Sequence, residues 1–136
     1  MLLENQLKSN LEKYINEAKT AKQNNDAEAA TKAMQKAWDT IPDTKNEYDE
    51  SYRVAKYFVQ LNLFFKRNED AKKWAVKIYE CDINRIETGE REHIHGRVEL
   101  ALNNIEKAKE LFKIAYQKSE GREFTRNDSK YLQLIK

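Results

Sequence analysis

The amino-acid sequence predicts an all-α protein built from stacked pairs of antiparallel helices. Turn-forming residues are scarce, with three glycines and one proline in 136 residues, so many short strands are not expected. Apolar residues recur at three- and four-residue spacing along most of the chain, which is the pattern of amphipathic helices. Clusters of Asn and Asp interrupt these stretches and predict turns between the helices. At this length we expect one domain covering residues 1–136.

The first helix pair is expected at residues 2–41. Leu7, Leu11 and Ile15 lie on one stripe of a helix from about residue 2 to 22. The polar residues 23–26 predict a turn and a helix cap, because Asn and Asp side chains accept hydrogen bonds from free amides at a helix start. The second helix should end before Pro42, since proline disfavours helical geometry in the residue before it.

The second pair is expected at residues 48–88, with a turn at 68–70 and Gly89 ending its last helix. Its first helix is unusually apolar and should be buried on more than one side. Most of its aromatic residues are expected in the core, although Tyr57 and Phe65 lie off the main stripe and could anchor a partner. The aromatic residues of the pair are Tyr52, Tyr57, Phe58, Phe64, Phe65, Trp74 and Tyr79.

The third pair is expected at residues 90–120, with a turn at Asn103-Asn104 and an end at Gly121. A short last helix over about 128–135 would cap the fold. Aligning the alanine that follows each turn sets Ala30 against Ala71 and Ala108, which are 41 and then 37 residues apart. Such a period is typical of stacked helix pairs that share one core.

The pairs resemble the tetratricopeptide repeat, over roughly residues 11–120. The first pair matches its motif at Tyr14, Ala18, Asn25, Asp26, Ala30, Met34, Ala37 and Pro42. The third matches at Gly96, Asn103, Asn104, Ile105, Ala108, Phe112 and Ala115. The middle pair departs from it, because Val59 replaces a small residue and Trp74-Ala75 disturbs a large apolar position. The resemblance implies a protein-binding α-solenoid, and a plain helical bundle is the alternative.

In that architecture the first helix of each pair lines a concave surface where a ligand would bind. Placing the three helix pairs in the same register predicts a groove with a basic centre, suited to an acidic peptide or a carboxylate. Arg53 and Arg97 could bind carboxylates through two hydrogen bonds each. Equally, these side chains could simply solvate an exposed face. The expected partner-binding residues are Lys19, Lys22, Arg53, Lys56, Gln60, His93 and Arg97, with Ile15, Leu63 and Leu100 beside them.

Several other kinds of chemistry are disfavoured. The net charge of +2 and the mixing of both signs along the chain make nucleic acid an unlikely main partner. Catalysis and a bound cofactor are not expected, because no Gly-rich phosphate loop or nucleophile elbow is present. Cys81 should pack as a small apolar residue. Glu92, His95 and Glu99 form only half of a helical metal-binding pattern, so no metal site is expected.

The leading hypothesis is therefore a binding module for a protein partner. No leader or membrane span is recognised, which predicts a cytoplasmic location. Residues 121–132 resemble the end of small bacterial repeat proteins that neutralise secreted toxins, which would make the chain an immunity protein. RNA binding through the basic groove is a second alternative. Self-association is a third, and exposed apolar groups on the middle helix would be its sign.

Overall fold

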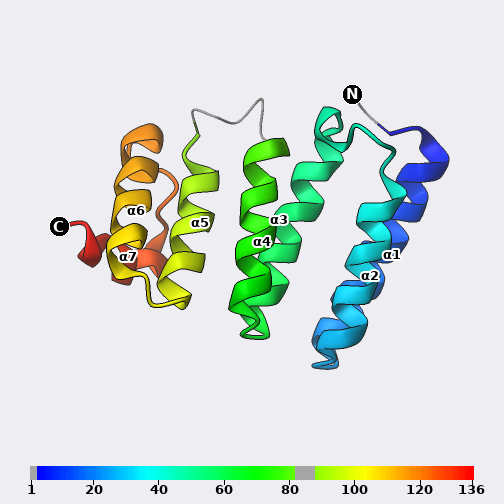
Figure 1. Ribbon diagram of the computed structural model, residues 1–136, viewed down its shortest axis with the longest axis horizontal. Coiled ribbons are helices and arrows are strands. Elements are labelled where there is room, and N and C mark those ends of the chain that lie inside the picture. The colour runs from blue at the N-terminus through cyan, green and yellow to red at the C-terminus, as the bar shows by residue number, and fades with distance from the viewer. Residues whose placement is uncertain (1–2, 82–87) are drawn as a thin grey trace. The chain divides into compact units, whose positions relative to one another are not determined.

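The computed structural model describes residues 3–81 and 88–136, and every regular element within them is helical (Figure 1). This confirms the all-α class. The chain divides into two compact units, Met1–Cys81 and Asp82–Lys136. The expected single domain over residues 1–136 stays a prediction.

Unit 1 contains α1 (Asn5–Gln23), α2 (Ala27–Thr40), the 3-10 turn η1 (Lys45–Glu47), α3 (Asp49–Phe64) and α4 (Asn68–Cys81). Unit 2 contains α5 (Glu90–Ala101), α6 (Ile105–Ser119), the 3-10 turn η2 (Arg126–Asp128) and α7 (Ser129–Leu134). These bounds agree with the expected helices to within a few residues. The expected extension of the fourth helix falls on residues 82–87, which lie outside the described residues.

The turns within the three helix pairs have the same backbone hydrogen bonds. Asn25, Lys66 and Asn103 adopt left-handed conformations with φ of 58°, 60° and 67°. In each turn the amide of this residue donates to the carbonyl three residues earlier, and the next amide donates to the carbonyl five residues before it. This is the Schellman closure of a helix C-terminus, which satisfies carbonyls that the helix leaves free.

The repeated turn fixes the start of the second helix in every pair. The amides of Ala30, Ala71 and Ala108 each donate to the carbonyl four residues earlier, so the three alanines are structurally equivalent. The prediction placed the middle turn at residues 68–70, which is wrong: the turn is centred on Lys66, and Asn68 already belongs to α4. Lysine rarely takes a left-handed conformation, so the sequence offers no signal at this position.

The apparent irregularity of the middle pair is an exchange of side-chain sizes. The residue seven positions before the left-handed one is Ala18, Val59 or Gly96. The residue nine positions after it is Met34, Ala75 or Phe112, and all six are buried. At Gly96 a Cβ atom would lie 2.8 Å from the Phe112 ring, so the smallest residue is matched with the largest. At the equivalent positions of the middle pair the larger residue is Val59 and the smaller one is Ala75, and both are buried.

The middle helix α3 is buried on several sides, as its composition predicts. It has eight buried residues and packs on both α2 and α4. Trp74 of α4 stacks on Phe58 of α3 at 3.9 Å between ring centroids and meets Trp38 of α2 edge-on at 5.0 Å. Phe64 is the exception, because its expected place in the core is wrong: it is 52% exposed.

Candidate functional site

The two first helices of unit 1, α1 and α3, exchange side-chain contacts along their length. Arg53 of α3 pairs with Glu12 of α1, and Lys22 of α1 lies over the ring of Phe64 of α3. The two contacts follow the same order along both helices, so the helices run parallel. In each contact, the residue of α3 follows its partner on α1 in the sequence by close to 41 residues, which is the spacing between the equivalent Ala30 and Ala71.

A hollow of about 430 Å³ lies on this face, and we call it the α1–α3 hollow. It is lined by Lys19, Lys22, Gln23, Tyr57 and Phe64. Two of the sequence-predicted residues, Lys19 and Lys22, therefore meet at one concave site. Gln60 is exposed on α3, one helical turn from both Tyr57 and Phe64.

The α1–α3 hollow combines positive charge with aromatic surface. The Lys22 ammonium lies 4.7 Å from the centroid of the Phe64 ring. Within residues 3–81 and 88–136, neither Lys19 nor Lys22 forms a salt bridge, so both charges are available to an anion. Burial raises the pKa of Tyr57 further above its ordinary value, so its hydroxyl is a neutral hydrogen-bonding group.

Arg53 is already neutralised at one end of this face. Its guanidinium forms two hydrogen bonds with the Glu12 carboxylate, the second at 3.2 Å. The hydrogen bond from Arg53 lowers the pKa of Glu12 and in turn raises that of Arg53. Both side chains are more than 40% exposed, so the pair contributes at most about 1 kcal/mol. Lys56, half-buried on the same helix, also takes part in an interaction within the chain.

Two residues expected on the open surface are buried instead. Ile15 is 1% exposed and packs in the core of unit 1. His93 is 6% exposed because residues of the C-terminal segment cover it. Its ring lies 4.8 Å from that of Phe124 and 5.8 Å from that of Tyr131, measured between centroids. The prediction that His93 is exposed for binding is therefore wrong.

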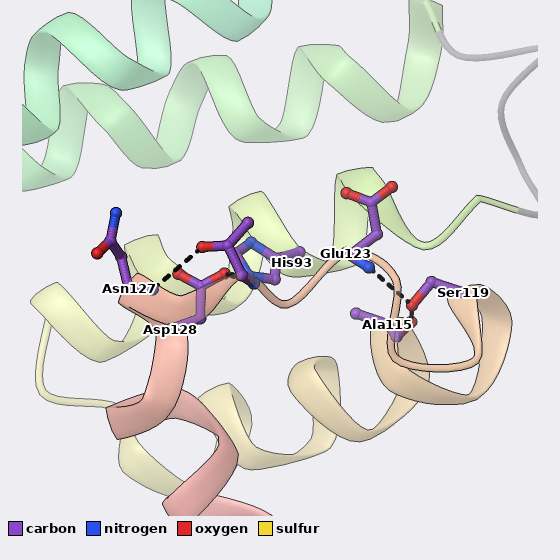
Figure 2. A network of polar contacts seen from close by, with 7 residues as sticks. His93, Ala115, Ser119, Glu123, Asn127 and Asp128 are labelled. Carbon is purple, nitrogen blue, oxygen red and sulfur yellow. Dashed lines mark hydrogen bonds and ion pairs between the residues drawn. The ribbon is translucent and has the colours of Figure 1, made fainter.

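His93 instead holds the C-terminal segment in place. Its Nε2 lies 3.2 Å from Oδ2 of Asp128, which also accepts a hydrogen bond from the Thr125 amide at 2.9 Å (Figure 2). Burial, followed by the charge of Arg97, lowers the pKa of His93 despite the nearby Asp128. Arg97 is partly buried, and its Nε has no hydrogen-bond partner among the residues that the structure describes. Both residues belong to unit 2, whereas the residues of the α1–α3 hollow belong to unit 1.

The acidic residues of α5 serve internal contacts. Glu92 accepts hydrogen bonds from Lys118 at 2.8 Å and from Arg91 at 3.0 Å. Glu99 accepts one from Asn104 at 2.7 Å and lies 3.3 Å from His95. Among the described residues no three metal-ligating side chains come together. No helix in the described ranges is both long enough and apolar enough to cross a membrane.

The sequence did not single out Gln23 or Phe64 as binding residues. Phe64 ends α3 two residues before the left-handed Lys66, a position at which the first pair has Gln23 and the third has Ala101. Only this comparison between equivalent positions could have revealed that Phe64 faces outward.

No protein-family model matches the chain, and searches of curated proteins and of solved structures found no match.

Proposed function

We propose that the chain is a protein-binding module that recognises an acidic segment of its partner at the α1–α3 hollow. The observation that carries this proposal is the meeting of Lys19 and Lys22 with Tyr57 and Phe64 at one concave site. Unpaired ammonium groups attract carboxylates, and exposed aromatic rings supply contact area at low entropic cost. A partner segment with Asp or Glu beside an apolar residue would satisfy both.

The finer proposal for the architecture is a tetratricopeptide-like stack. Two observations support it. The three turns share one hydrogen-bond pattern, and α1 and α3 run parallel, with contacting residues that are about as far apart in the sequence as Ala30 and Ala71. The first helices of such a stack line its concave side, where these modules have their ligand surface. The α1–α3 hollow would then belong to the concave side.

Charge reversal of the two lysines tests the proposal. Tagged wild-type protein and a Lys19→Glu/Lys22→Glu variant would be used to capture partners from lysate of the source cells. The wild type should recover one stoichiometric protein and the variant should not, because two attractive contacts become repulsive. A Lys13→Glu/Lys32→Glu variant is the matched control, since both lysines are exposed outside the hollow.

The other possible results of the capture experiment would change the proposal in different ways. Equal capture by all three proteins would contradict the hollow as the binding site, provided that circular dichroism shows equal helicity. Recovery of nucleic acid without protein would replace the proposal with RNA binding, for which the stacked basic and aromatic groups would also be suited. A toxin domain as the captured protein would support the more specific immunity function that residues 121–132 suggest.

A further inference from the structure

Unit 2 has a second hollow, on a different part of the chain from the one proposed above. It measures about 500 Å³ and lies where α6 meets the C-terminal segment. We call it the α6–α7 hollow. Its lining residues are Lys113, Tyr116, Gln117, Gly121, Phe124, Leu132, Ile135 and Lys136.

The turn after α6 builds one wall of this hollow. Glu120 and Gly121 both take left-handed conformations, with φ of 54° and 83°, and the Gly121 amide donates to the Tyr116 carbonyl. A Cβ atom on Gly121 would lie 3.1 Å from the Tyr116 ring, so the glycine lets this ring lie against the backbone. Phe124 follows, with its ring centroid 5.7 Å from that of Tyr116.

The opposite wall is α7, which has only six residues and depends on tertiary contacts for its helical structure. Tyr131 stacks on the buried Phe112 at 4.8 Å between ring centroids. Asp128 just before α7 contacts His93, and Ser119 accepts a hydrogen bond from the Glu123 amide (Figure 2). These contacts fix the segment, so the hollow is formed before any partner arrives.

The chemistry of the α6–α7 hollow is apolar and positive. Four of the eight lining residues have apolar or aromatic side chains, and Tyr116 is 45% exposed. Lys113 and Lys136 are the two charged lining residues, and no carboxylate side chain is among the eight. Residues 112–136 contain six Lys or Arg against three Asp or Glu, whereas the whole chain has a net charge of only +2. One of the three acids, Asp128, is already used by His93, and one of the six bases, Lys118, is already used by Glu92.

We propose that the α6–α7 hollow is a docking site for a partner segment with one large apolar side chain flanked by Asp or Glu. The apolar side chain would enter between Tyr116 and Leu132, where burial of its surface supplies the affinity. The flanking carboxylates would meet Lys113 and Lys136, which sets the specificity against neutral or basic segments. This site does not depend on the α1–α3 hollow, so either could exist without the other.

A peptide selection on the intact chain tests the proposal. Random short peptides displayed on phage would be selected on the biotinylated wild-type protein, and the enriched peptides synthesised. Their affinities would be measured for the wild type and for a Lys113→Glu/Lys136→Glu variant. A Lys32→Glu/Lys107→Glu variant is the control, because it makes the same charge change at exposed lysines outside both hollows.

We expect a class of peptides with a single Leu, Phe or Trp next to acidic residues. This class should bind the Lys113→Glu/Lys136→Glu variant at least about tenfold more weakly and the control variant nearly as well as the wild type. Replacing the apolar residue of the peptide with Ser should abolish its binding. The Lys19→Glu/Lys22→Glu variant should still bind this class, which separates the result from the function proposed for unit 1.

Three results would overturn the proposal. The first is a selection that enriches no such class, and the second is a class whose affinity is the same for the wild type and the Lys113→Glu/Lys136→Glu variant. The third is self-association of the wild type in analytical ultracentrifugation that the Lys113→Glu/Lys136→Glu change removes, because a second copy of the chain would then occupy the hollow. Nuclear magnetic resonance shifts at Tyr116 and Ile135 during a peptide titration provide an independent check of the location.

Discussion

The helices α1 and α5 begin equivalent pairs, yet their outward positions have different fates. On α1, Lys19 and Lys22 remain at the rim of a hollow, without salt bridges in the described part of the chain. On α5, the residues at the equivalent positions are Arg97 and Leu100, and both are partly buried. Ile15 of α1 and His93 of α5 are also equivalent, and both are buried, Ile15 in the core of unit 1 and His93 beneath Phe124 and Tyr131. Equivalent turns therefore place equivalent residues on the same face of their helices, but the residues that cover this face differ between the two units.

The largest expected effect of this difference is on the stability of the two units. Phe112 is completely buried and contacts His93, Phe124 and Tyr131, so Phe112→Ala should destabilise unit 2 by about 3–5 kcal/mol. The equivalent Met34→Ala change should destabilise unit 1 by about 2–5 kcal/mol. Amide hydrogen exchange, followed residue by residue, measures both. Loss of protection in both units from either change would mean that they unfold together, which would contradict their description as separate units.

A fall in pH is expected to have a smaller effect on the stability of unit 2. Because the folded pKa of His93 is lowered, the unfolded chain binds a proton at His93 more readily than the folded chain does. The contribution of neutral His93 to stability is therefore present above the unfolded pKa of about 6.5 and is lost as the pH falls through the folded pKa. The wild type should lose stability in unit 2 over this range more steeply than a His93→Gln variant.

Denaturant unfolding at a series of pH values between about 7.5 and 5.5 would measure this slope. The Glu12 carboxylate of unit 1 has a lowered pKa as well, so its contribution disappears only under more acidic conditions. Equal slopes for the wild type and His93→Gln would show that His93 is not the group whose protonation destabilises unit 2 as the pH falls.

Local rules were sufficient to predict the all-α class and most of the helix bounds from the sequence. Asp26 caps α2 through its side chain, with the Ala29 amide donating at 3.1 Å, as its position after Asn25 suggests. The bounds of α5 and α6 followed from Gly89, from the turn at Asn103-Asn104 and from Gly121. The turn at Lys66 could not be predicted in this way, because its geometry is imposed by the packing of α3 on α4 and not by the residue itself.

The candidate site was harder to predict, because exposure depends on contacts between distant residues. Lys19 and Lys22 were found from the register alone. The register also selected Arg53 and His93, but it carries no information on Glu12, which neutralises Arg53, or on Phe124 and Tyr131, which cover His93. Phe64 was assigned to the core because aromatic residues are usually buried, although Gln23 at the equivalent position of the first pair was a sequence signal for exposure.

A photo-crosslinking measurement tests the central claim, that the α1–α3 hollow is the binding surface, most directly. A photoreactive phenylalanine analogue would replace Gln60, which is exposed on α3 between Tyr57 and Phe64, or Lys32, which is exposed on α2 outside the hollow. Irradiation of source cells that express each variant should give one discrete crosslinked protein from position 60 and none from position 32. The same crosslinked protein from position 32 with none from position 60 would contradict the account.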